Sequence, residues 1–375
     1  MPASFLKTDE ILVNMGPQHP STHGVLRLVL RTDGELVREA FPHIGYLHRC
    51  AEKIGESVSV TQFIPYTDRM DYLAAMNNNL AFCLAVEKAA GIEVPKRAQY
   101  LRVLAAELNR IASHLVAVGT FGLDLGAFTI FCYTFREREQ ILQIFERMCG
   151  ARLTYSYLRH GGVMRDIDDD IIEDVKVFLH VMESKWPEYN QLLSENEIFI
   201  RRTANVGIIP PDRAIANGLT GPCLRGSGVS FDCRKAFPYS GYEDFEFQIP
   251  VGTGQKGTLG DAWDRYWVRM LEIRESIRIC RQVIDNLPDG PVMGPVPKSI
   301  KIPEGQECYV PTENPRGELG FYIIGGGKDV LYRCRARGPS FCNLSITHEV
   351  CHDVLLADIV AVIGSFDIVL GEVDR

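Results

Sequence analysis

The sequence predicts an α+β fold in which long helices form most of the core and a small β-sheet region lies at the N-terminus. Two observations support this fold class. Short runs with alternating apolar residues are typical of strands, and they occur at residues 11–13, 25–30 and 36–41. Further along the chain, apolar residues recur instead at the spacing of helices. We therefore expect one domain over residues 1–375, mainly β over 1–60 and helical over 61–375, with a late β-hairpin.

The loop between the first two strands, residues 16–24, is the first candidate for a functional segment. It contains two prolines and two glycines, which make it short and stiff, and it places His19 and His23 four positions apart. Loops held by a rigid sheet often carry chemistry. The alternative is that both imidazoles only satisfy backbone groups of the loop.

Helical segments dominate the rest of the chain. They are predicted at residues 47–57, 66–90, 135–148, 263–284 and 349–363, with two more that begin at Pro95 and at Asp168. The helix that begins at Pro95 carries an apolar stripe formed by Leu101, Leu104, Leu108, Ile111, Ala112 and Leu115. Residues 205–258 are rich in glycine and proline and predict a long ordered loop. A hairpin is expected over residues 317–337, and the chain should end in an extended piece.

Charge and cysteine content exclude several classes of function. A formal net charge of −8 without a long basic stripe argues against nonspecific nucleic-acid binding. The eleven cysteines are scattered and form no Cys-x-x-Cys pair, so we expect reduced, mostly buried thiols in a cytosolic compartment. Residues 1–14 lack the pattern of a signal peptide. The most apolar stretch, residues 354–370, is interrupted by Asp358 and Asp367, so we expect no membrane-spanning helix.

Four segments together resemble one protein family. They are residues 15–25 (MGPQHPSTHGV), 42–49 (PHIGYLHR), 66–72 (YTDRMDY) and 367–375 (DIVLGEVDR). They are similar to the D subunit of the proton-pumping NADH:quinone oxidoreductase, respiratory complex I. The resemblance implies a peripheral subunit on the cytoplasmic side of the bacterial inner membrane. Its partners would be the iron–sulfur B subunit, the C and I subunits and the membrane H subunit, with quinone as substrate and no nucleic acid.

This family is related to the large subunit of nickel–iron hydrogenases, which holds its metals through four cysteine thiolates. In this sequence the positions of the first cysteine pair are occupied by Asp71 and Ala74. Those of the second pair are occupied by Val369 and Glu372. Soft thiolate ligands are what such a metal cluster requires. The resemblance therefore implies the hydrogenase large-subunit scaffold without its metal site. The vacated space is where the family binds a quinone headgroup.

Reduction of a quinone needs two electrons and two protons, and the resemblance implies which side chains supply the protons. His23 would hydrogen-bond one quinone carbonyl and Tyr72 the other, since an imidazole exchanges protons near neutral pH and a phenol donates to a carbonyl oxygen. Asp124 would hydrogen-bond His23 and favour its protonated form. His19 and Thr120 would line the same pocket. From the residues alone, a tyrosine near a helix start, such as Tyr72, is usually a core residue, and the alternative for Asp124 is a helix-end cap.

The electrons would come from outside this chain, because its sequence contains no cofactor motif. In the family they come from a 4Fe–4S cluster on a neighbouring subunit, and the resemblance places Arg49 and Arg69 beside that cluster. A fixed positive charge there stabilises the reduced cluster; the alternative is an ordinary ion pair with a helix carboxylate. At Thr154 the chain departs from the family, which usually has a histidine whose protonation is coupled to cluster reduction. Threonine has no proton to exchange near neutral pH.

Two other functions compete with this interpretation. His348, Glu349 and His352 satisfy H-E-x-x-H, the zinc-protease pattern, and Glu372 follows at a plausible spacing for a third ligand. Taken alone, the motif predicts a metal-assisted hydrolase with Glu349 as the base. The extended chain expected around residues 368–369 argues against it, because a zinc protease carries its third ligand back on a helix. The other alternative is a noncatalytic scaffold in a hydrogenase-related complex, which retention of the proton-donating residues argues against.

Overall fold

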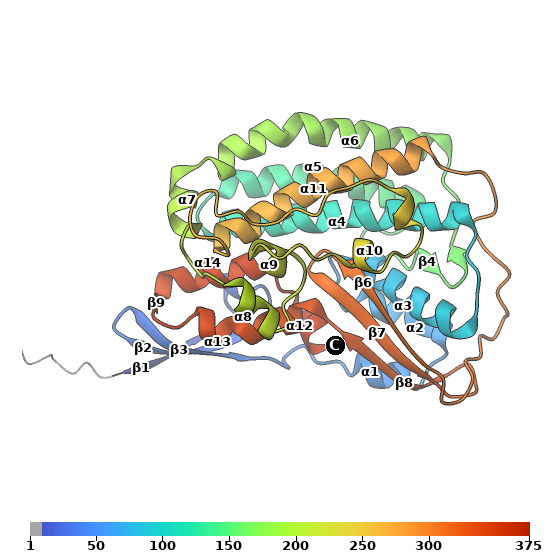
Figure 1. The fold of residues 1–375 in the computed structure, drawn as a ribbon, viewed down its shortest axis with the longest axis horizontal. Coiled ribbons are helices and arrows are strands. Elements are labelled where there is room, and N and C mark those ends of the chain that lie inside the picture. Colours follow the sequence, from blue (N-terminus) through green and yellow to red (C-terminus); the bar gives the residue numbers. More distant parts are fainter. Residues whose placement is uncertain (1–9) are drawn as a thin grey trace, which may run out of the picture.

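A computed structural model describes residues 10–375 as a layer of long helices packed over two larger antiparallel sheets, with a third, two-stranded sheet formed by short strands (Figure 1). In Figure 1 the long helices lie along the top. The N-terminal sheet lies at the lower left and the second large sheet at the lower right. The predicted α+β class is confirmed.

The N-terminal sheet has the strand order β1–β2–β3–β9. Its strands are β1 (Ile11–Met15), β2 (Arg27–Asp33), β3 (Leu36–His43) and β9 (Val354–Leu355). The first three confirm the predicted strands, and all neighbours are antiparallel. Successive side chains point to opposite faces, so Leu28, Leu30 and Ala40 face the core. Because β9 comes from the end of the sequence, this sheet joins the N-terminal loop to the C-terminal segment.

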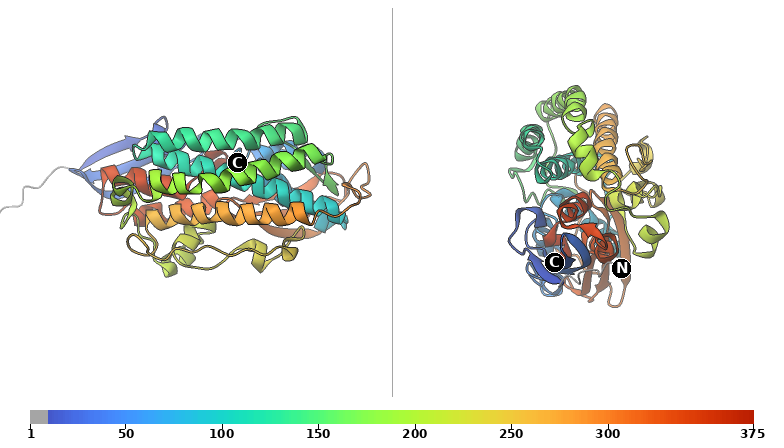
Figure 2. Two further views of the ribbon diagram at one scale, coloured as in Figure 1. Left: turned by 90° about the horizontal axis from the view of Figure 1, so that it is seen from above. Right: turned by 90° about the vertical axis from the view of Figure 1, so that its left-hand side faces the viewer.

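Four long helices form the outer layer and lie side by side (Figure 2). They are α4 (Lys96–Asp124), α5 (Phe128–Cys149), α6 (Asp169–Tyr189) and α11 (Ala262–Asp285). Helix α4 is central, since it contacts α5, α11 and the C-terminal α14 (Leu356–Phe366). Its predicted apolar stripe is buried, and so are Arg102, Glu107 and Arg110. Buried charges persist only when they are paired, so this core contains a polar network.

The second large sheet has the order β6–β7–β8, with β6 at Glu307–Asn314, β7 at Gly317–Gly325 and β8 at Leu331–Arg337. The pairing of β7 with β8 confirms the predicted hairpin, whereas β6 was not predicted. Helix α3 (Ala75–Ala90) packs on β6 and β7, and α1 (Ala51–Gly55) packs on β8. The tight turn between β6 and β7 buries Arg316 in the core.

The predicted helix over residues 66–90 is wrong, because the chain forms two helices there. Helix α2 (Val60–Asp68) begins at a capping box formed by Ser59 and Gln62, and it ends where the longer helix was expected to start. A turn then leads to α3. The side-chain amide of Asn78 donates to the carbonyl oxygens of Thr67 and Asp71, both at 3.0 Å, and so holds this turn closed.

The C-terminal prediction also needs correction. The helix expected over residues 349–363 is divided into α13 (Thr347–Val350), strand β9 and α14. The last residues form a short helix, α15 (Leu370–Asp374), and not an extended piece. The expected loop over residues 205–258 is ordered, but it contains four short helical elements. They are the helices α8 (Pro211–Ala216), α9 (Gly221–Gly226) and α10 (Cys233–Ala236) and the 3₁₀ turn η3 (Tyr242–Asp244).

The remaining elements are short and lie between those already described. They are η1 (Pro20–Thr22), β4 (Leu158–Arg159), β5 (Gly162–Val163), the π-helical turn η2 (Asn190–Ser194), α7 (Glu197–Thr203), α12 (Pro339–Asn343) and η4 (Leu344–Ile346). All eleven cysteines are free thiols, and most are buried, as the sequence predicts. Within residues 10–375, no helix has the length and apolar character needed to cross a membrane.

Candidate functional site

The first predicted site residue, His23, lies at the end of the N-terminal loop and faces the end of helix α4. Its Nε2 atom is 3.3 Å from Oδ2 of Asp124, the last residue of α4, and both side chains are nearly buried, at 13% and 10% exposure. The two atoms are close enough for an ion pair but are not aligned as a hydrogen bond. His23 also has a φ of 49°, a left-handed conformation that is uncommon outside glycine. The fold therefore holds this imidazole against the carboxylate at a conformational cost.

Close helix packing positions Asp124. Helix α14 lies against α4, and Gly364 makes this contact possible because a Cβ atom there would lie 2.8 Å from the Phe121 ring. The η1 turn, immediately before His23, contacts the same α14 helix. Thr120 lies one helical turn before Asp124, is half-buried, and donates its hydroxyl to the Val116 carbonyl oxygen at 2.8 Å.

His19 does not join this pair. Its side chain is exposed, and Nδ1 accepts a hydrogen bond from the Ser21 backbone N–H at 3.2 Å, which caps η1. For this nitrogen the simpler interpretation, that a loop histidine satisfies the local backbone, is correct. Its other ring nitrogen has no described protein partner.

Tyr72 lies in the turn between α2 and α3, and not within a helix as expected. It directly follows Asp71, whose Oδ2 accepts a 2.8 Å hydrogen bond from Nη1 of buried Arg316. Burial raises the pKa of Tyr72; the Arg316 and Arg49 cations oppose the rise, whereas the Asp71 and Asp367 carboxylates add to it. The phenol therefore stays protonated at neutral pH and is available as a donor.

The C-terminal motif closes onto the segment that contains Arg49. Oδ1 and Oδ2 of Asp374 accept hydrogen bonds from the backbone N–H groups of Gly45 and Leu47 at 2.8 and 2.7 Å. The backbone N–H of Arg49 donates to the carbonyl oxygen of Arg375 at 3.1 Å. The fold thus assembles motifs that are more than 300 residues apart.

The same C-terminal motif also reaches the turn that carries Tyr72. Gly371 approaches the Met70 carbonyl oxygen so closely that a Cβ atom would lie 2.5 Å from it. Only glycine fits at this position without moving the backbone.

Arg49 and Arg69 lie together on the surface and line a cavity of about 480 Å³ with Tyr66, Met70 and Ile54. Nη2 of Arg49 donates to the carbonyl oxygen of Arg69 at 2.6 Å. Nη1 of Arg69 lies 3.6 Å from the buried Asp68 carboxylate, so an ordinary ion pair accounts for part of its placement. Arg49 has no carboxylate within ion-pair distance among residues 10–375. The cavity therefore presents two guanidinium groups beside apolar surface.

Thr154 belongs to the same side of the molecule. Two residues further on, Ser156 donates its hydroxyl to Oδ2 of Asp68 at 2.6 Å, which attaches this segment to the end of α2 beside Arg69. His160 is not placed to substitute for the missing histidine. It is buried with its Nε2 3.3 Å from the Val60 carbonyl oxygen, and burial lowers its pKa to about 4.

The positions that correspond to the four hydrogenase cysteines, Asp71, Ala74, Val369 and Glu372, are all buried. Asp71 and Glu372 are fully buried, and the Arg316 guanidinium lies between Asp71 and Asp367. The Arg316 side chain therefore lies beside these positions, and a quinone headgroup in this space stays a prediction. Sequence reasoning missed Arg316, and its only local signal was its place in the tight turn before Gly317.

The H-E-x-x-H segment lacks the geometry of a zinc site. Helix α13 ends at Val350, so His348 and His352 do not share a helical face. Both carboxylate oxygens of Glu349 accept hydrogen bonds from Arg213, at 2.9 and 2.5 Å. Glu372 is buried elsewhere, and its Oε2 accepts a hydrogen bond from the Ser340 backbone N–H. Among residues 10–375, no group of three or more His, Cys, Asp or Glu side chains is placed to hold a metal ion.

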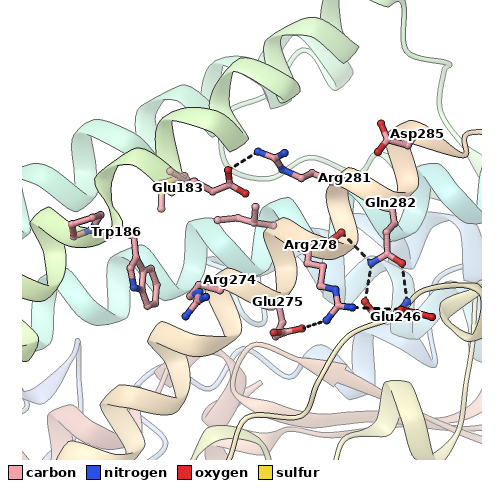
Figure 3. Close-up of a pocket in the computed structure, with 12 residues that line it drawn as sticks. Glu183, Trp186, Glu246, Arg274, Glu275, Arg278, Arg281, Gln282 and Asp285 are labelled. Atoms are coloured by element: carbon pink, nitrogen blue, oxygen red, sulfur yellow. Dashed lines mark hydrogen bonds and ion pairs between the residues drawn. The ribbon is translucent and has the colours of Figure 1, made fainter.

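A cavity of about 840 Å³ lies between α6 and α11 and is lined by none of these residues (Figure 3). Some of its charged side chains pair with each other: Arg281 with Glu183 at 2.6 Å, and Arg278 with Glu246 at 3.5 Å. Arg274 lies over the Trp186 ring. Arg281 and Arg278 are therefore already paired with carboxylates, whereas no ion pair is found for Arg274 or Asp285 among residues 10–375.

Comparison with known proteins identifies the class. The family model of the 49 kDa subunit of respiratory-chain NADH dehydrogenase matches residues 124–304 and 295–375. The chain belongs to this family, as its four sequence segments indicated.

Curated relatives agree along the whole chain. The chain is 53% identical over 371 residues to the D subunit of the NADH-quinone oxidoreductase of Bacillus cereus, covering 99% of this chain and 100% of the relative. It is 50% identical over 380 residues to a D subunit of the same kind of enzyme from Cytophaga hutchinsonii, with 99% and 97% covered. It is 51% identical over 374 residues to the D subunit from Chlorobium luteolum, with 99% and 94% covered.

Proposed function

We propose that this chain is the subunit of an NADH:quinone oxidoreductase that supplies protons for quinone reduction. The quinone headgroup would bind in a pocket completed by an iron–sulfur B subunit, and its reduction would be coupled to proton pumping. The observation that carries the proposal is the nearly buried pair of His23 and Asp124, held at 3.3 Å by a strained loop. None of the cavities described above is lined by His23, Tyr72 or Asp124, which agrees with a pocket that needs a second chain.

In the proposed reaction, two side chains of this subunit each give one proton to the quinone. His23 donates from Nε2 to one carbonyl oxygen, and Asp124 stabilises its positive charge before the transfer. Tyr72 donates its phenolic proton to the other carbonyl oxygen. A 4Fe–4S cluster on the partner would supply the two electrons one at a time, so the product would be the quinol. His19 and Thr120 would complete the wall of the pocket.

The face that contains the Arg49–Arg69 cavity suits the partner's cluster. Two guanidinium groups on one side of the cavity favour a more negative, reduced centre. We propose this face as the contact with the B subunit, with the C and I subunits and the membrane H subunit as further partners. The complex would lie on the cytoplasmic side of the membrane.

Replacement of Asp124 by asparagine tests the proposed pair. We expect Asp124→Asn to lower kcat for quinone in the assembled complex about tenfold. An interaction with a charged group contributes ~1–1.5 kcal/mol more than a neutral hydrogen bond. A matched control is Asp166→Asn, which removes an exposed carboxylate paired with Arg97. Electron transfer to an artificial acceptor upstream of the quinone reports assembly. If both variants reduce quinone at the wild-type rate, the scaffold alternative is favoured.

A redox titration tests the consequence of Thr154. We expect the potential of the partner's terminal cluster to depend on pH by much less than about 59 mV per unit, the value for one proton per electron. Threonine exchanges no proton, and His160 is neutral at pH 7 because its pKa is about 4. With Thr154→His, the potential of the partner's cluster should fall as pH rises. A full pH dependence in the native complex that His160→Ala abolishes would show that His160 has taken the role.

A further inference from the structure

A buried cluster of charged side chains lies near Tyr72, where Arg316, Asp71 and Asp367 act electrostatically on the phenol. Arg316 donates from Nη1 to Oδ2 of Asp71 at 2.8 Å and from Nη2 to Oδ1 of Asp367 at 3.3 Å. Glu372 is the third carboxylate, and its Oε2 accepts a hydrogen bond from the Ser340 backbone N–H at 2.9 Å. These residues come from the α2–α3 turn, the β6–β7 turn and the C-terminal segment that includes α15, and each is at most 7% exposed.

The cluster contains more acid than base. Three carboxylates face two guanidinium groups, since Arg269 on α11 adds a second cation 3.8 Å from Oδ2 of Asp367. Ser113 on α4 and Asn314 on β6 are neutral neighbours. Counted with these two cations alone, the cluster carries one net negative charge, which binding of one proton removes; a buried net charge is costly.

Three buried polar atoms of the charged residues in the cluster lack hydrogen-bond partners: Oδ2 of Asp367, Nε of Arg316 and Nε of Arg269. The Asp367 oxygen therefore has a lone pair available to receive a proton. Asp367 also has a φ of 54°, so the chain holds it in an uncommon left-handed conformation. A cluster needed only for folding would have been expected to satisfy these atoms.

We propose that Asp71, Asp367 and Glu372 share one exchangeable proton around Arg316, and that this proton replaces the one Tyr72 gives to quinone. In the step, a carboxyl O–H bond breaks, the Tyr72 phenolate gains the proton, and the cluster changes from neutral to singly negative. A proton from solvent then restores it. The role in turnover rests on the proposed function of Tyr72. Proton binding by the cluster does not depend on that function.

The acidity of the groups supports the direction of this transfer. Burial, and after it the negative charge of Asp71, raises the pKa of Glu372 to about 7. Burial also raises the pKa of Tyr72 above its ordinary value. A carboxyl group near neutrality is a stronger acid than such a phenol, so the proton moves from the cluster to the phenolate. The Arg49 cation, whose Nη2 would lie 3.4 Å from a Cβ at Gly371, also faces this region.

Proton binding is tested by infrared spectroscopy of the assembled complex. We expect the carbonyl stretch of a protonated carboxyl group to disappear as pH rises between about 6 and 8. The band should be absent in Glu372→Gln and present in Glu349→Gln, which alters an exposed carboxylate whose pKa is held low by Arg213. A spectrum in which Glu372→Gln removes no band overturns the proposal, whatever the outcome for Tyr72.

The role in turnover is tested with two variants of Glu372. Glu372→Gln leaves two carboxylates with two cations and no proton to give, so we expect kcat for quinone to fall about tenfold or more at unchanged KM. Glu372→Asp should restore most of the activity, which a purely structural role would not require. Wild-type turnover and pH profile in an assembled Glu372→Gln complex would refute the role.

Ser340→Ala keeps the proposal testable if Glu372→Gln does not assemble. The Ser340 side chain holds the pKa of Glu372 down. Its removal should therefore shift the decline of turnover with rising pH to a higher pH. An unshifted profile in an assembled Ser340→Ala complex would count against the cluster as the proton source.

Discussion

Tyr72→Phe is expected to reduce kcat for quinone about 10²–10³-fold while the complex still assembles. The variant removes one hydroxyl and keeps the ring, and loss of a donor that acts in the transition state costs ~2.7–4 kcal/mol. Tyr72 lies in a turn fixed by Asn78, and its hydroxyl has no described protein partner that the change would orphan. The fold should therefore be unaffected.

The measurement for Tyr72→Phe is steady-state quinone turnover in the assembled complex, with an upstream artificial acceptor to report electron entry. Tyr66→Phe is a matched control, because Tyr66 is exposed and lines the Arg49–Arg69 cavity on α2. We expect the control to retain turnover within a few-fold, since no donated proton is lost. Equal kcat and KM in wild type and Tyr72→Phe would remove Tyr72 from the site.

Glu107→Gln is expected to destabilise the fold by about 3–5 kcal/mol, the cost of breaking a buried ion pair from one side. Glu107 lies in the middle of α4 and is completely buried. It accepts hydrogen bonds from Arg234 at 3.0 Å, Tyr242 at 2.6 Å and Ser276 at 2.6 Å, and it pairs with Arg110 at 3.3 Å. Burial alone would raise the pKa of Glu107, but the two arginines outweigh it and hold the pKa below its ordinary value.

Glutamine preserves the shape of Glu107 but removes the charge that compensates two buried guanidinium groups. Thermal unfolding of the complex, or the amount of this chain incorporated into it, measures the effect. Glu349→Gln is the control, because its pair with Arg213 is exposed and such pairs contribute about 0–1 kcal/mol. If the two variants are equally stable, the network around Glu107 does not stabilise this core.

Local sequence signals determined the strands and most long helices of this protein. The alternation in β1, β2 and β3 and the apolar stripe of α4 arise from residues close together in the chain, so periodicity finds them. The motifs also identified the family. The family resemblance implied the pairing of His23 with Asp124, which the structure brings to 3.3 Å although they are 101 residues apart.

Only the tertiary structure decided which polar residues are buried and what pairs with them. Glu107 and Arg110 have the sequence appearance of a solvated helix face, and their burial depends on partners from α10 and α11. Arg316 in a tight turn and Glu372 near the chain end show no local sign of facing Asp71. Helix α2 ends before Tyr72, and Tyr72 lies in a turn, because Asn78 and the C-terminal segment contact the chain between α2 and α3. Such contacts join distant parts of the chain, so their effect is absent from any local pattern and is set by packing alone.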